Sequence, residues 1–110
     1  MRFLVVSNNK FIIKNIKKSV DVEIFIDVVE TGLDGVYYAQ SEMFDLCIID
    51  NDLPDIKGFE VAKLIRAGRV LIPIIVLIKI NNPAYAEMVL DSGADDCVLT
   101  EENLSMLLAR

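Results

Sequence analysis

The chain has 110 residues, 54% hydrophobic and 25% charged, which fits one compact domain and is too short for two. Its 11 basic and 17 acidic residues give a net charge of −6, which argues against a nucleic-acid-binding surface in this segment. The longest apolar run, 70–78, is interrupted by Pro73 and is shorter than the roughly 18 residues of a membrane span, so we expect no membrane insertion.

Five apolar segments are predicted to form β-strands, because each is short, rich in Val and Ile, and bounded by polar or turn residues. The N-terminal segment turns polar too soon to be a secretory signal and is interpreted as the first strand. The five predicted strands are 3–6, 22–29, 46–49, 71–78 and 97–99.

Helical signals follow each predicted strand. Asn8 and Asn9 are typical capping residues, and the helix after them is expected to present an apolar face and a lysine-rich face. The apolar face is predicted to hold Phe11, Ile12, Ile16 and Val20, with Lys10, Lys14, Lys17 and Lys18 mainly outward. Four further helices are expected to begin at Thr31, Gly58, Asn82-Pro83 and Thr100.

Strands that alternate with helices indicate βαβ units, and therefore an α/β fold: a doubly wound five-stranded parallel sheet with five helices. If the strand order is the flavodoxin-like 2-1-3-4-5, Cys47 and Cys97 lie on strands separated by a third. Their backbones would then be roughly 10 Å apart, too far for a disulfide. We expect two reduced thiols in a cytoplasmic protein.

Asp50 is the most informative residue of the chain. It closes the apolar run 46–49 and is followed by polar and turn residues, including Asp52 and Pro54. This pattern predicts a buried strand that delivers a carboxylate to the carboxyl edge of the sheet, where open α/β sheets place their ligand and reaction sites.

The segments together resemble the receiver domain of two-component response regulators, a CheY-like fold. The resemblance covers the whole chain. Segment 45–50 with Leu53-Pro54 is similar to the phospho-acceptor strand and its loop, and segment 72–77 to the fourth strand. Gly-Ala-Asp-Asp at 93–96 and Leu-Leu-Ala-Arg at 107–110 resemble the winged-helix (OmpR/PhoB-like) transcription-factor class.

The resemblance assigns Asp50 as the phospho-acceptor position, but the rest of the reactive set is replaced. The family has two acids that hold Mg²⁺ after the first strand, a hydroxyl residue ending the fourth strand, and an aromatic residue and a lysine on the fifth. In this chain those positions hold Ser7, Asn8, Ile78, Cys97 and Thr100, in that order. We therefore expect a degenerate site.

Mg²⁺ prefers several carboxylate oxygens, and here only Asp50 and, less strongly, Asp52 are candidate ligands. Asp55 is a further weak alternative, and Lys79 is interpreted as a solvated loop residue, since a one-residue step from Ile78 reverses its direction. We expect no cofactor, weak or absent Mg²⁺ binding, no catalytic residue, and slow or absent phosphorylation.

The family class also implies a symmetric homodimer through the fourth helix, fifth strand and fifth helix. Its salt-bridge pattern is matched only in part, and Met106 replaces an acid that the class has there. The predicted interface residues are Asp91, Asp95, Asp96, Met106 and Arg110.

We therefore predict an atypical receiver domain, not an enzyme, that signals or dimerises largely without aspartyl phosphorylation in transcriptional regulation. The pattern at 107–110 lacks a stop signal, so we expect a longer protein in which residues 1–110 are one receiver domain before a C-terminal DNA-binding domain. Expected partners are a second copy and a sensor kinase or other protein, with no membrane. The alternatives are a working phospho-acceptor receiver that uses Asp50, and a stand-alone protein-docking receiver.

Overall fold

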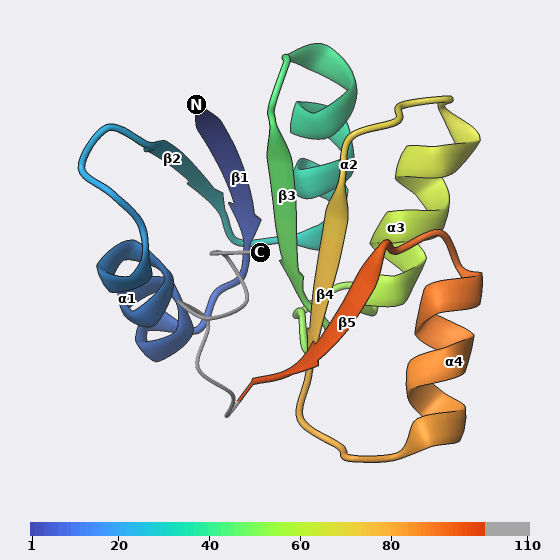
Figure 1. Ribbon diagram of the computed structural model, residues 1–110. Coiled ribbons are helices and arrows are strands. Elements are labelled where there is room, and N and C mark those ends of the chain that lie inside the picture. The colour runs from blue at the N-terminus through green and yellow to red at the C-terminus, as the bar shows by residue number, and fades with distance from the viewer. Residues whose placement is uncertain (101–110) are drawn as a thin grey trace.

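The computed structural model of the protein describes residues 1–100. Five parallel strands form one sheet in the order β2-β1-β3-β4-β5, as expected (Figure 1). The strands are β1 (Arg2–Val6), β2 (Phe25–Val29), β3 (Leu46–Asp50), β4 (Ile74–Ile78) and β5 (Asp96–Leu99).

Four helices lie within the described part of the chain. They are α1 (Lys10–Ser19), α2 (Gly32–Ser41), α3 (Gly58–Ala67) and α4 (Pro83–Asp91). Each connects two parallel strands, which gives the doubly wound α/β fold that the alternation predicted. The fifth predicted helix falls on 101–110, outside the described residues.

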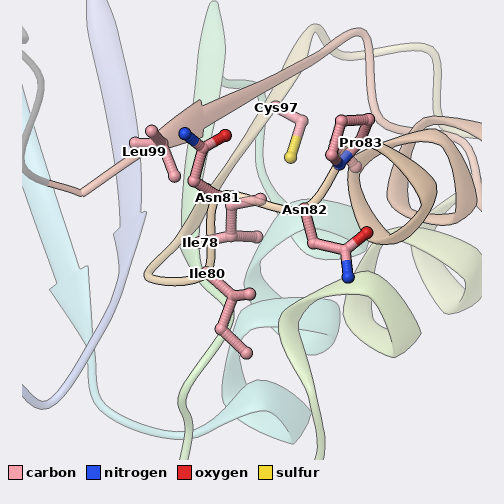
Figure 2. Close-up of a pocket in the computed structure, with 8 residues that line it drawn as sticks. Ile78, Ile80, Asn81, Asn82, Pro83, Cys97 and Leu99 are labelled. Atoms are coloured by element: carbon pink, nitrogen blue, oxygen red, sulfur yellow. The ribbon is translucent and has the colours of Figure 1, made fainter.

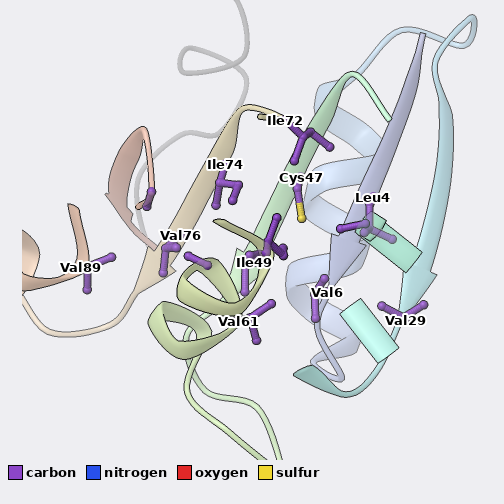
Figure 3. Close-up of a cluster of buried hydrophobic side chains, with 14 of the residues drawn as sticks. Leu4, Val6, Val29, Cys47, Ile49, Val61, Ile72, Ile74, Val76 and Val89 are labelled. Carbon is purple, nitrogen blue, oxygen red and sulfur yellow. The ribbon is translucent and has the colours of Figure 1, made fainter. Parts of the chain in front are cut away.

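The sheet buries an apolar cluster on each face, because successive side chains of a strand point to opposite faces. One cluster packs under α2, α3 and α4 and contains Leu4, Cys47, Ile49, Val61 and Val76 among others (Figure 3). The other packs under α1 and contains Phe3, Val5, Ile12, Ile16, Ile48, Leu77 and Val98. The middle strands are therefore apolar on both sides, as buried parallel strands are.

Asparagine caps fix the start of two helices. The Asn9 side chain accepts hydrogen bonds from the backbone N–H groups of Phe11 and Ile12, and Asn82 does the same for the first turn of α4. The predicted apolar face of α1 is right for Ile12 and Ile16 but wrong for Phe11, which is 72% exposed. Phe11 directly precedes Ile12 and is turned roughly 100° from it, away from the sheet.

Two strands begin later than predicted. Residues 22–24 form a turn, closed by the Ile24 N–H on the Asp21 carbonyl, and Val22 is fully exposed. Pro73 has no N–H to donate to a ladder, so β4 starts only at Ile74. Apolar composition alone does not separate these approach segments from the paired strands.

Cys47 and Cys97 are both free, and β4 lies between their strands, as predicted. Within residues 1–100, no helix combines the length and the apolar character needed to cross a membrane.

Candidate functional site

The carboxyl edge of the sheet brings Asp50 and Ser7 together. β1 and β3 are parallel neighbours with Val6 opposite Ile49. The residues that follow them, Ser7 and Asp50, therefore lie side by side. The Ser7 hydroxyl donates to Asp50 Oδ2 at 2.9 Å, and the Asp52 backbone N–H donates to Oδ1 at 3.0 Å. Asp50 is only 2% exposed, and each of its oxygens has a partner from its own chain.

Burial raises the pKa of Asp50 above its ordinary value of 3.8. The hydrogen bonds from the Asp52 N–H and the Ser7 hydroxyl act in the opposite direction, as does the charge of Lys79, but they do not compensate for the lost hydration. The site thus holds a carboxyl group whose ionised form is less favourable than in water.

Lys79 lies in the loop after β4 with its side chain largely exposed, as interpreted, and it also forms an ion pair at this site. Its Nζ lies 3.3 Å from Asp52 Oδ2, and the Lys57 Nζ lies 3.8 Å from Oδ1 of the same carboxylate. Leu77 pairs with Asp50 in the sheet register, and Lys79, two residues further, keeps the direction of Leu77. The partner of its ammonium group is Asp52, and its charge also acts to lower the pKa of Asp50.

Asp55, the weak alternative for a metal ligand, caps the N-terminus of α2. Its carboxylate accepts the backbone N–H groups of Gly32 and Leu33 at 2.8 and 2.9 Å. Desolvation acts to raise the pKa of Asp55, but these and other backbone hydrogen bonds outweigh it and lower the pKa. An acid at a helix N-terminus is stabilised there by unpaired N–H groups.

A buried asparagine that the sequence did not single out joins β3 to two helices. The Asn51 side chain accepts the Phe59 N–H of α3 at 3.1 Å and donates to the Tyr85 hydroxyl of α4 at 2.6 Å. The Phe59 and Tyr85 rings meet edge to face, with centroids 6.4 Å apart. The sequence signal was a polar residue directly after a buried acid, but neither partner is near it in sequence.

The β4–β5 side of the edge is apolar. Ile78 is 4% exposed and belongs to the cluster under α2–α4, so it offers no hydrogen bond to an oxygen near Asp50. The Thr100 hydroxyl donates to the Ile78 carbonyl at 3.0 Å, beside the Thr100 N–H, which donates to the same carbonyl at 2.8 Å. Cys97, on β5, lines a pocket of about 180 Å³ next to Ile78 (Figure 2).

Three of the five predicted dimer residues lie within the described part of the chain. Asp91 ends α4 and is exposed, and Asp96 begins β5. Asp95 is engaged within the chain, because its Oδ2 accepts both an Arg66 guanidinium N–H at 2.9 Å and the Ile74 N–H at 2.8 Å. Met106 and Arg110 lie outside the described residues.

Comparison with known proteins identifies the family. A family model for the response regulator receiver domain matches residues 3–110. The chain belongs to this family. The resemblance drawn from Asp50 and its surrounding segments is therefore confirmed.

Relatives of this receiver domain are transcriptional regulators by name. It is 28% identical over its full length to the transcriptional regulatory protein CusR of Escherichia coli K12 and covers 49% of that protein. It is 31% identical to the virulence transcriptional regulatory protein PhoP of Shigella flexneri and covers 50% of it. The chain thus spans about half the length of these curated relatives.

The fold has close structural counterparts. The BeF3-activated receiver domain of DrrB, a Thermotoga maritima OmpR/PhoB homolog, superposes with a TM-score of 0.86 at 28% identity. The match covers 99% of this chain and 92% of that domain.

The residues of this receiver domain do not fit the Mg²⁺ ion that the family binds. Ser7 uses its proton to bond Asp50 and brings no charge, and Asn8 is exposed and neutral. The Asp52 carboxylate is paired with two lysines. Among residues 1–100, no group of three or more His, Cys, Asp or Glu side chains is arranged to hold a metal ion. A hard divalent cation would find one buried carboxylate whose oxygens are already bonded.

Proposed function

We propose that this receiver domain works in a two-component transcriptional regulator without phosphorylation of Asp50. In this proposal it acts as a dimerisation or regulatory module, and DNA is read by a domain outside this chain. The observation that carries the proposal is the pairing of the Asp50 carboxylate with the Ser7 hydroxyl and the Asp52 N–H.

Two features of the site oppose phosphoryl transfer: the absence of the family's charged groups at positions 7, 8 and 100, and the hydrogen bonds on Asp50. Transfer to a carboxylate depends on positioning and on neutralising the charge of the phosphoryl oxygens, which metal ions and lysines usually supply. Ser7 and Asn8 supply no charge in the metal-binding positions, and Thr100 offers a neutral hydroxyl that already donates to the Ile78 carbonyl. The hydrogen bonds on Oδ1 and Oδ2 also lower the nucleophilicity of whichever oxygen attacks.

The proposal is tested by incubating the protein with acetyl phosphate and Mg²⁺ and measuring intact mass over time. We expect no phosphorylated species above the background of an Asp50→Ala control. A phosphoryl adduct that appears within minutes in the wild-type chain and is absent from the Asp50→Ala variant would refute the proposal.

One observation favours the alternative of a working phospho-acceptor. Lys79 approaches the site from the end of β4, and its charge lowers the pKa of Asp50 in opposition to burial. In that case Lys79 would take the place of the lysine missing at position 100. The Lys79→Met variant separates the two functions, because it would abolish an adduct that depends on this cation and would leave an unreactive site unchanged.

The same proposal includes a homodimer through α4, β5 and the segment that follows. Exposed Met88 and Leu90 on α4 offer apolar contact on this helix, and Asp91 adds a charge at its end. A sensor kinase or other protein is the second proposed partner. Sedimentation at tens of micromolar tests the dimer, and a purely monomeric chain would count against it.

A further inference from the structure

A pocket of about 180 Å³ lies between the β4–α4 loop, α4 and β5. The Cys97 sulfur is directed into the space bounded by Ile78, Asn81 and Pro83 (Figure 2). Cys97 is partly buried rather than covered, so the pocket is open to small molecules. The lining residues are Ile78, Ile80, Asn81, Asn82, Pro83, Ala86, Cys97 and Leu99.

The size of the pocket matches one aromatic ring. A cavity of about 150 Å³ with aliphatic walls is large enough to bind benzene, and this one is slightly larger. Aliphatic side chains and polar groups contribute about equally to its wall, and the Cys97 thiol behaves as a small apolar group with a weak S–H donor. The short side chain of Cys97 leaves this volume between β5 and the start of α4.

Asn81 and Asn82 supply the amide side chains among the residues that line the pocket. No charged side chain lines it, so an ionised ligand would lose its hydration without gaining a counter-ion. Asn82 uses its Oδ1 to cap α4, whereas the exposed Asn81 carries both a donor and an acceptor at the rim. These features select a neutral ring that carries one hydrogen-bonding group.

We propose that this pocket binds a neutral single-ring aromatic molecule with one hydroxyl or carbonyl substituent. The ring lies against Ile78 and Cys97, and the substituent reaches the Asn81 amide. Such a ligand contacts β4, α4 and β5 at once, and therefore bears on the surface proposed for dimerisation. Its regulatory role rests on the proposed function, since it gives the domain an input that needs no phosphoryl group, but the binding itself does not.

The test is a titration of the whole 110-residue chain with phenol, followed by amide chemical shifts, without Mg²⁺ or a phosphoryl donor. We expect saturable shifts at residues 78–86 and 97–99, with a Kd on the order of 1 mM, as suits a ligand of few atoms. Benzoate should bind at least about five-fold more weakly, because its carboxylate is charged. Phenol should also slow alkylation of Cys97 by iodoacetamide.

Variants separate this pocket from other sites. Cys97→Phe fills the pocket from β5 and Ala86→Leu narrows it from α4, and each should weaken phenol binding at least ten-fold. Cys97→Ser keeps the volume and should change the Kd less than about three-fold. Dispersed amide spectra show whether each variant is folded, and either filling variant alone is sufficient if the other fails to fold.

Three outcomes would overturn the inference: no saturable shift with phenol, unchanged affinity in the folded filling variants, or benzoate that binds as well as phenol. The last result would point to the neighbouring pocket that contains Lys57 and Lys79. Failure here is distinct from failure of the proposed function. Phenol can bind a chain whose Asp50 accepts phosphoryl groups, and Asp50 can stay unreactive in a chain that binds no phenol.

Discussion

The two halves of the carboxyl edge differ in how their side chains are paired. On the β1–β3 half, the Ser7 hydroxyl and the Asp52 N–H donate to Asp50, so each carboxylate oxygen has a hydrogen-bond partner. On the β4–β5 half, Ile78 is apolar and Cys97 is small, and space remains between them and α4. Hydrogen bonds thus close one half of the edge, and the other half keeps an open space.

The largest expected effect comes from restoring the family's reactive set on both halves of the edge. A variant with Ser7→Asp, Asn8→Asp, Ile78→Thr and Thr100→Lys regains the charges and the hydroxyl that phosphoryl transfer uses. Because one electrostatic contact in a transition state is worth roughly 10² to 10³ in rate, we expect modification by acetyl phosphate to rise at least about 100-fold. Intact mass over time measures it.

The control for this variant is the same set of changes with Asp50→Ala, which should stay unmodified. If the folded variant reacts no faster than the wild-type chain, the absent charges are not what limits the site, and the contrast between the two halves loses its chemical meaning.

A second prediction concerns Asn51, which links the end of β3 to α3 and α4. Asn51→Leu removes both side-chain bonds and leaves the Phe59 N–H without its partner, so we expect a loss of about 2 kcal/mol in unfolding free energy. Tyr85→Phe removes only the hydroxyl and should cost about 1 kcal/mol. Urea unfolding of each variant measures these differences.

The double variant Asn51→Leu/Tyr85→Phe provides the matched comparison. Because Tyr85 cannot lose a bond that is already absent, the two losses should sum to more than the loss in the double variant. Additive losses would mean that the bond between the two side chains does not link the halves energetically.

The smallest expected effect is the pH dependence that Asp50 gives to the folding stability. Its folded pKa is raised, so its contribution to stability is complete below the unfolded pKa of about 3.8 and is lost as the pH rises through the folded value. Asp50→Asn removes this dependence. The stability of the variant relative to the wild-type chain, measured by thermal unfolding, should therefore increase as the pH rises above about 3.8. A difference that stays constant or falls over this range would contradict the burial argument.

The fold was predictable because its signals are local. Asn9 and Asn82 cap helices as expected, Gly68 follows the last residue of α3, and apolar runs mark all five strands. The strand order was taken to be the flavodoxin-like one of doubly wound folds, and it was correct. Strand starts were less predictable, since Val22 is as apolar as a strand residue but lies in an exposed turn.

The site was predictable only as a set of positions. The sequence indicated that Asp50 would be buried at a strand end, but the partner of Lys79 depends on the register between β3 and β4. The Asn51–Tyr85 bond joins residues 34 apart, and a polar residue after a strand does not reveal which helix it will reach. The pocket beside Cys97 depends on how α4 packs against β5, which no local pattern encodes.

Arg66 has a consequence for any assembly on the α4–β5 face. It donates to the carbonyls of Gly93 and Val70 and pairs with Asp95, so it joins the end of α3 to the segment before β4 and to the segment before β5. A cation from a second molecule that approaches Asp95 would have to share a carboxylate that is already paired with Arg66. Asp95 would then help to orient the two copies but add little to their affinity. Apolar contacts would have to provide most of the binding free energy.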